Sequence, residues 1–389
     1  MATTTSSVIR TPGAAFQAAS GLVAQLSQGA GAIGIVLVVR EHTGSVALAG
    51  AVAGVLSIAA GLARPLQGRL MDRRGVAAVN AVCGIVHPAA LIAIVGVSVG
   101  DGSHALLLVL GVIAGLALAP VSTAMRVAWG EAVGDGDRTA AYSTVYLIQE
   151  LSLLTAPLIF AALTATFSAA VGLVVVAALS GVGTLAFAAS ARSVHTGQVP
   201  PRENRVGLLR IGRMRLLLGS AAAVGAVIGG IQVGVPTLAA AHHKPAAAGV
   251  LIAMLSIGGI AGAAAYGSRQ WASDAAARLT LVTVALTACT ATMVATEGLV
   301  VLGLLLLLTG LVLNPMLTTL SLLVDRLTSE PTAAEAFGWL STGIATGTGA
   351  AAAISGALVQ HGEGARPAFA VAAVAAASAA VLALVLRRY

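Results

Sequence analysis

Long apolar runs alternate with short polar breaks along the whole chain. Each run is close to the length of about 20 residues that a helix needs to cross the hydrocarbon core of a bilayer. The runs predict about twelve transmembrane helices, at residues 14–39, 45–66, 76–98, 105–128, 140–164, 168–190, 214–238, 246–266, 277–296, 299–323, 336–358 and 367–386. No polar stretch is long enough for a soluble domain. We expect the first run to be a retained span, because no small-residue cleavage site of a signal peptide follows it.

Composition supports a membrane protein. The chain is 58% hydrophobic and 9% charged, with a mean hydropathy of +0.97. Soluble domains are about 25% charged, and a soluble fold of this size would need more polar residues to cover its surface. We therefore expect an all-α integral membrane protein, a multi-pass monomer of a bacterial cytoplasmic membrane.

Lys and Arg residues orient the predicted spans. If both termini are cytoplasmic, every Lys and Arg except Arg40, Lys244 and Arg366 lies on the cytoplasmic side. This is the asymmetry that cytoplasmic loops show, so we expect cytoplasmic termini. The net charge of +7 does not indicate nucleic-acid binding, because the basic residues lie in short loops and only three Trp, four Tyr and six Phe are present.

The chain divides into two related halves. The hydrophilic stretch at 191–213 lies near its middle, and we predict an N-terminal six-helix bundle (1–195), a cytoplasmic linker (196–212) and a C-terminal six-helix bundle (213–389). A faint internal repeat aligns Leu56-Ser57-Ile58 with Leu255-Ser256-Ile257, Gly68 with Gly267, Gly115 with Gly310, Pro120 with Pro315, and Ala141-Tyr142 with Ala336-Phe337. The matches fall in equivalent spans. Pseudo-symmetric bundles of this kind place a substrate site between them, near the midplane.

A short motif follows the second span. The residues Gly68, Asp72, Arg73, Arg74 and Gly75 lie in a stretch that matches a Gly-x-Leu-x-Asp-Arg-x-Gly pattern. This resembles the signature of the major facilitator superfamily, and the paired six-span halves and long central loop agree with it. The resemblance implies that Asp72 caps a helix of the opposite half and that the five residues belong to a gate. For the arginines, plain anchoring at the cytoplasmic surface remains the alternative.

The motif departs from the family pattern in two places. Val76 and Ala77 stand where the family has a further basic pair, so a longer charge relay is in doubt. The repeat copy that begins at Gly267 has Trp271 in place of the Asp.

Two further segments resemble the drug–proton antiporter branch of that family. Arg126 in span four is followed by Gly130, and Ala156-Pro157 in span five stands where that branch has Gly-Pro. The flanking glycines are replaced by Ser152, Phe160 and Ala161. The match therefore rests on Arg126 and Pro157.

Glu150 is the acidic residue that lies well inside a predicted span. A charged group at membrane depth costs about 2.5–3.5 kcal/mol on insertion scales, and Glu150 lies about 15 Å into span five at helical rise. Removal from water favours the neutral form of a carboxyl group, so we predict that Glu150 couples transport to protons or binds a cation. The alternative is a structural Glu bonded to Arg126 or to a neighbouring helix.

Arg126 is the proton-coupling partner that we predict for Glu150. It lies within about a turn of the inner boundary of span four. It could pair with Glu150 when the cavity closes, or with Glu131. Extension of its side chain to the membrane surface is the simpler alternative.

Uncharged polar and aromatic residues inside the spans are candidates for substrate binding. In the resembling family, spans one, four, seven and ten line the central cavity. The candidates are Gln25, Gln28, Tyr146, Gln232, Asn314 and Trp339. Tyr146 recurs with Glu150 at helical spacing, which suggests a polar stripe facing a cavity. Interhelical hydrogen bonding is the alternative for each, and for Trp339 an interfacial position.

The sequence also lacks several motifs. It has no Gly-x-x-x-x-Gly-Lys-Ser/Thr loop for ATP, no metal-ligand spacing and no nucleophile–base set, so we expect neither an enzyme nor a cofactor. We hypothesise a secondary transporter that uses alternating access and the proton gradient to export small organic molecules, drugs or secondary metabolites. Proton-coupled uptake of a metabolite and a non-transporting membrane receptor remain the alternatives.

Overall fold

The protein is a bundle of long helices. The computed structural model describes residues 13–100, 102–134, 136–191, 207–244, 247–328, 332–360 and 364–388. The elements are α2 (Ala14–Ala24), α3 (Leu26–Thr43), α4 (Val46–Arg74), α5 (Val76–Val99), α6 (His104–Leu116), α7 (Val121–Ala132), α8 (Arg138–Thr166), α9 (Ala169–Ala191), the 3-10 turn η1 (Leu208–Arg210), α10 (Gly212–Ala241), α11 (Ala247–Gly267), α12 (Ala275–Val294), α13 (Leu299–Leu327), α14 (Ala333–Val359) and α15 (Arg366–Arg388).

These helices confirm the twelve predicted spans. Twelve segments of the described chain are long and apolar enough to cross a membrane. The least clearly divided pair of runs is separated as predicted, because α12 ends at Val294 and α13 begins at Leu299. Of the predicted linker (196–212), residues 196–206 lie outside the described residues.

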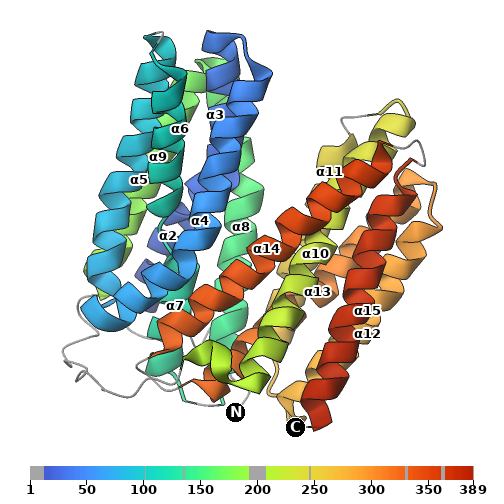
Figure 1. Ribbon diagram of the computed structural model, residues 1–389. Coiled ribbons are helices and arrows are strands. Elements are labelled where there is room, and N and C mark those ends of the chain that lie inside the picture. Colours follow the sequence, from blue (N-terminus) through green and yellow to red (C-terminus); the bar gives the residue numbers. More distant parts are fainter. Residues whose placement is uncertain are drawn as a thin grey trace.

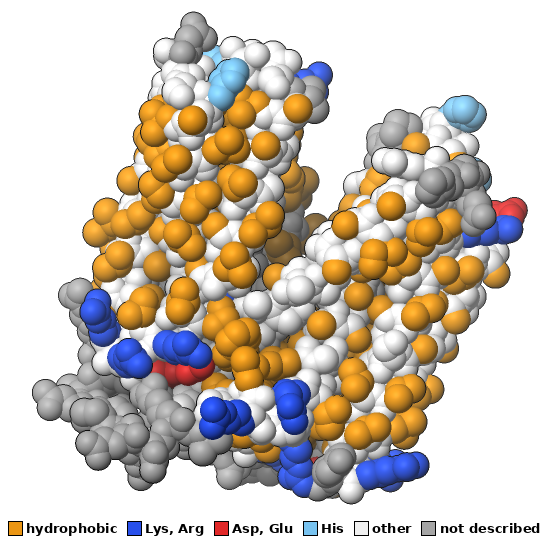
Figure 2. Space-filling model, in the orientation of Figure 1, with side chains coloured by type: hydrophobic (Ala, Val, Ile, Leu, Met, Phe, Trp, Pro, Cys, Tyr) orange, Lys and Arg blue, Asp and Glu red, His pale blue; other side chains and the backbone are white. Residues whose placement is uncertain are grey.

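The outer surface of the helices is apolar. Leu62 is 66% exposed, Leu281 70% and Val300 79%, and Figure 2 shows hydrophobic side chains along both bundles. Soluble monomers rarely expose continuous apolar patches of this extent. Lipid tails solvate such side chains directly, so this surface belongs in a bilayer.

The helices form two bundles that meet at one end. Figure 1 shows α2 to α9 on one side and α10 to α15 on the other, close together near the C-terminal end of α15 and apart at the opposite end. The bundles touch where α4 and α7 meet α14 and where α8 meets α11 and α13. We call these ends the closed end and the open end; Figure 2 shows the hollow between the bundles at the open end.

Equivalent helices of the two bundles pack in the same way. A β-carbon on Gly115 of α6 would overlap the Leu56 carbonyl oxygen of α4, and one on Gly310 of α13 would overlap the Leu255 carbonyl oxygen of α11. These are residues that the internal repeat aligns. The same glycine therefore brings the same pair of helix backbones together in each half, as small residues do in membrane bundles.

Span four is not continuous. The apolar run at 105–128 predicted one helix, but the structure has α6, then an irregular stretch at 117–120, then α7. Pro120 has no amide hydrogen to donate into a helix and clashes with the preceding turn. Unwound backbone at membrane depth is tolerated only where other protein groups satisfy it.

Two side chains of α4 satisfy this break. Gln67 donates from Nε2 to the carbonyl oxygens of Leu116 and Leu118, at 2.9 and 3.0 Å, and Arg64 donates to the carbonyl of Ala119 at 3.2 Å. The position of α7 is thereby tied to α4, which carries the Gly68–Gly75 motif.

The close contact at Gly310 gives a stability prediction. We expect Gly310→Ala to lower the melting temperature of the detergent-purified protein, because overpacking costs about 1–3 kcal/mol. Gly303 on the same helix is the control: its β-carbon would meet only the Leu251 side chain at 3.4 Å, an ordinary contact. Equal melting temperatures for Gly310→Ala and Gly303→Ala would contradict the packing argument.

Candidate functional site

The helices α4 and α14 cross in direct backbone contact at the closed end. A β-carbon on Gly68 would overlap the carbonyl of Ala334, and one on Gly338 would approach the carbonyl of Arg64. Further along the pair, Thr342 donates to the carbonyl of Gly61 at 2.9 Å. Glycines at both sides of the crossing allow the last turns of α4 to lie against the first turns of α14.

Asp72 caps α14 across the boundary between the bundles. Its Oδ1 accepts a hydrogen bond from the Ala334 amide and its Oδ2 from the Glu335 amide, both at 3.0 Å. The first amides of a helix lack partners within the helix and carry partial positive charge. Gly75, with φ of +84°, ends α4 just after this carboxylate. This is the capping contact that the family resemblance implies.

An ion pair accompanies the cap, and Arg69 forms it rather than Arg73 or Arg74. Arg69 donates from Nε to Glu335 Oε1 at 2.8 Å, and Trp339 donates from its indole nitrogen to the same oxygen at 3.3 Å. The Arg73 and Arg74 side chains are exposed, which suits anchoring at a membrane surface. Their role in gating stays a prediction.

A second polar seam joins α8 to α13. Arg138 pairs with Asp325, Tyr146 and Ser321 share a hydrogen bond at 3.0 Å, and Ser143 donates to a threonine of α13 at 3.4 Å. The two helices run antiparallel, since the start of α8 at Arg138 meets Asp325 near the end of α13, whereas Glu150, further along α8, meets Asn314 in the middle of α13. Together with the Asp72 cap, the seam closes this end.

Glu150 makes the last of these polar contacts between α8 and α13. Asn314 of α13, 1% exposed, donates from Nδ2 to Glu150 Oε1 at 3.3 Å. Gly259 of α11 faces the same carboxylate, and a β-carbon there would lie 3.3 Å from Oε1 and 2.7 Å from Asn314 Nδ2. Side chains of α8 from Ala140 to Tyr146 are buried, whereas Glu150 is half-buried. The carboxylate therefore lies where the two bundles begin to separate.

Arg126 does not pair with Glu150 in this conformation. Its side chain is 3% exposed, and its guanidinium carbon lies 4.6 Å from the ring centroid of Tyr146 and 5.9 Å from that of Phe337. Within the described part of the chain it forms no ion pair, with Glu131 or with any other acid. Cation–π contacts hold it in the contact between the bundles.

The predicted substrate residues are dispersed. Gln25 is buried and donates to the Gly21 carbonyl of its own span at 3.0 Å, Gln28 is half-buried, and Gln232 is exposed. The other three, Tyr146, Asn314 and Trp339, take part in the closed-end contacts described above. Tyr146 thus packs between the bundles and does not face an open cavity here. Substrate binding by any of the six stays a prediction.

The seam on α13 was missed in the sequence, although a signal for it exists. Asn314, Thr318, Ser321 and Asp325 recur at steps of four, three and four residues, which places them on one face of a helix. In span ten, Asn314 beside Pro315 was the residue predicted to bind substrate. Glu335 was also missed, because an acidic residue in the first turn of a span looks like an ordinary loop residue.

The fold and the closed-end contacts define a class of membrane transporter with two helical bundles that part at one end. The family profile described as Major Facilitator Superfamily matches residues 18–330. The chain belongs to the major facilitator superfamily, and it is a transporter of that family. The match does not single out the drug–proton antiporter branch.

Solved structures of three transporters share this fold. A bacterial homologue of the iron transporter ferroportin, in an outward-facing state, superposes with a TM-score of 0.78 at 16% identity over 96% of this chain and 99% of that one. The human organic anion transporter MFSD10 superposes with a TM-score of 0.73 at 17% identity, over 95% of this chain and 98% of that one. The fucose:proton symporter FucP of E. coli superposes with a TM-score of 0.71 at 13% identity, over 96% of this chain and 98% of that one. No curated protein matches the sequence. At these identities the likeness shows the fold alone.

The Asp72 cap gives a prediction about opening. We expect Asp72→Ala to raise the rate at which a maleimide labels a cysteine placed at Thr318, which is 0% exposed, with Cys83 and Cys289 replaced by Ala. Loss of a helix cap costs about 1 kcal/mol, so labelling should rise about five-fold. Arg210→Ala in η1, exposed and outside the predicted gate, is the control. If both variants label at the same rate, the cap does not hold this end closed.

Proposed function

We propose that the protein is a proton-coupled secondary transporter that works by alternating access. The observation that carries this proposal is the position of Glu150, a carboxylate at membrane depth that bonds across the two bundles to Asn314 at the point where they separate. A carboxylate in this place can respond both to protons and to the relative position of the bundles. The driving force is the proton gradient, with no bound cofactor, and the working unit is a monomer.

The distribution of charge supports an orientation. Figure 2 shows most of the visible Lys and Arg side chains at the closed end, which carries the Gly68–Gly75 motif. Cytoplasmic loops are rich in Lys and Arg, so we assign the closed end and both termini to the cytoplasm of a bacterial cell. In this orientation the described conformation is open to the outside.

Protonation of Glu150 would change the free energy of enclosing it. A charged carboxylate between two bundles in the membrane requires water or a partner charge, whereas a neutral carboxyl requires only hydrogen bonds. The single amide of Asn314 satisfies part of that need. We infer that the charged form favours a state in which water reaches Glu150, and that the protonated form permits the bundles to close over it.

For direction and substrate we propose export of small organic molecules. The support is the pair of residues shared with the drug–proton antiporter branch: Arg126, buried on α7, and Pro157, which lies within α8. Uptake in the same direction as protons uses the same fold and remains the second candidate. Assay of transport in both directions separates the two.

The coupling proposal predicts the behaviour of Glu150→Gln. In everted vesicles, we expect the native protein to accumulate ethidium when a pH gradient is applied, and Glu150→Gln to lose this accumulation by at least about tenfold because Gln cannot exchange a proton. Exchange of ethidium without a gradient should persist. Glu41→Gln, exposed at the end of α3, is the control for loss of an acidic residue.

Each result of this assay has a defined meaning. Gradient-driven accumulation by Glu150→Gln would exclude Glu150 as the coupling residue. Movement of ethidium only in the direction of proton flow would favour uptake. Binding of ethidium with no movement by the native protein would favour a receptor.

A further inference from the structure

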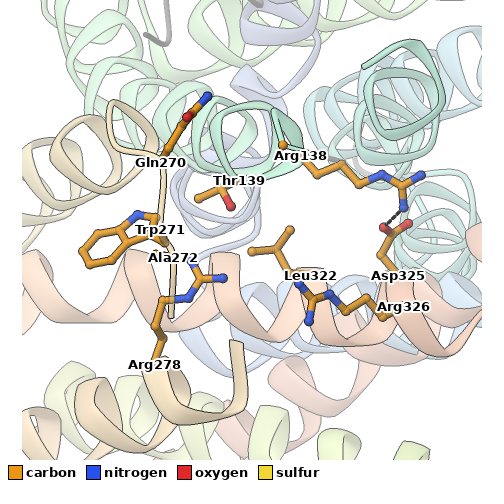
Figure 3. Close-up of a pocket in the computed structure, with 10 residues that line it drawn as sticks. Arg138, Thr139, Gln270, Trp271, Ala272, Arg278, Leu322, Asp325 and Arg326 are labelled. Carbon is orange, nitrogen blue, oxygen red and sulfur yellow. Dashed lines mark hydrogen bonds and ion pairs between the residues drawn. The ribbon is translucent and has the colours of Figure 1, made fainter. Parts of the chain in front are cut away.

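A second feature of the closed end is a cavity of about 710 Å³. It lies between the start of α8, the loop from α11 to α12, and the last turns of α13 (Figure 3). Its lining includes Arg138, Thr139, Trp271, Arg278, Asp325 and Arg326. Three cations and one acid in one small cavity indicate an affinity for anions.

The cavity occupies the position equivalent to the Asp72 cap. The repeat that aligns Ala141-Tyr142 with Ala336-Phe337 also aligns Thr139 and Ala140 with Ala334 and Glu335, the two residues whose amides Asp72 caps. The start of α8 therefore corresponds to the start of α14. Its N-cap residue makes no side-chain capping hydrogen bond.

In place of the capping carboxylate this half has Trp271. The Trp271 ring stacks on Tyr266 at 4.7 Å between centroids, and its indole nitrogen donates to the Tyr266 carbonyl at 3.0 Å. It supplies no negative charge to the start of α8. The N-cap residue of α8, Asp137, also makes no side-chain capping hydrogen bond, so the first amides of α8 lack the carboxylate partner that Asp72 gives to α14.

Arg278 is the buried cation of this cavity. Its side chain is 6% exposed, and in Figure 3 its guanidinium points into the cavity toward Thr139. One terminal nitrogen donates to the Tyr266 hydroxyl at 2.9 Å, and the ring centroids of Tyr266 and Trp271 lie 5.6 and 5.8 Å from the guanidinium carbon. Nε is buried without a hydrogen-bond partner.

The nearby acids do not neutralise Arg278. Asp325 pairs with Arg138, and Asp274 lies 3.5 Å from Arg326. Within the described residues, Arg278 has no acidic partner. A buried charge without a counter-charge is costly, and an anion in the cavity would remove that cost.

We propose that this cavity binds a phosphate group, held by Arg278 and the first amides of α8. Guanidinium groups and helix N-termini both recognise phosphate oxygens. The phosphate would cap α8 as Asp72 caps α14. It would stabilise the closed end as a bound ligand that is not part of the chain. A soluble phosphate and a phospholipid headgroup share this chemistry. Binding itself does not depend on the proposed proton coupling.

Thermal melting with defined anions tests the proposal. The native protein, purified in dodecyl maltoside, a detergent without phosphate, is titrated with inorganic phosphate, and a parallel sample in the same detergent receives phosphatidylglycerol. We expect a rise in melting temperature that saturates with phosphate, or that is present with phosphatidylglycerol alone. The first result identifies a soluble phosphate as the ligand and the second a lipid headgroup. No stabilisation in either sample would overturn the proposal.

Variants locate the effect in the cavity. Arg278→Gln should raise the anion concentration needed for half of the stabilisation by at least about tenfold, since it removes a charge-assisted contact. Arg269→Gln, exposed in the same loop and outside the lining, should respond as the native protein does. If Arg278→Gln does not fold, Ala272→Trp fills the cavity and keeps every charge, and it should also abolish the response. A full response in either cavity variant would place phosphate elsewhere.

Discussion

At the closed end, the first amides of a helix in one bundle donate hydrogen bonds to an acceptor on the other bundle, and the rest of the contact between the bundles depends on this. The first amides of α14 have no partner within their helix, and Asp72 of α4 accepts two of them. Loss of such a cap costs about 1 kcal/mol. Water can replace these hydrogen bonds at a membrane surface but not at the bilayer centre, so a cap in this place can be made and broken. A few such contacts, with the α8–α13 seam, are enough for a gate whose two states must differ little in free energy.

The two halves keep the same packing but differ in their gate chemistry. Gly115 against Leu56 and Gly310 against Leu255 make equivalent backbone contacts, and a larger residue at either would separate two helices. Rigid halves follow from such contacts. At the closed end the equivalence fails, because Asp72 caps α14 whereas Trp271 leaves the start of α8 beside a cationic cavity. The internal symmetry therefore shows where a capping hydrogen bond is missing, which neither half would show alone.

The sequence predicted the spans well because lipid requires long apolar helices and leaves few alternatives. The Asp72 contact could also be predicted, since its motif is local in the sequence and the family resemblance supplied the distant partner. The break in span four was not predicted: Pro120 is a signal for it, but Pro157 lies within an unbroken helix, and the groups that satisfy the break, Gln67 and Arg64, lie on another helix. The partners of Glu150 likewise depend on how two bundles meet. Asn314 and Tyr146 were expected to face substrate, yet in this conformation both lie in the contact between the bundles.

The contacts of Glu150 and Arg126 respond differently to a movement of the bundles. Glu150 bonds to Asn314 of the other bundle, so separating the bundles at the closed end must break that bond and the other contacts between α8 and α13. Arg126 and Glu150 belong to the same bundle, on α7 and α8, so rigid-body rocking leaves the distance between their backbones unchanged. A pair between them would require new side-chain rotamers, after Arg126 leaves the ring of Tyr146. Opening of the closed end would supply that condition, because Tyr146 loses Ser321 and water reaches the guanidinium. Pairing of Arg126 with Glu150 stays a prediction, and we infer that it would belong to the state that is open at the Asp72 end.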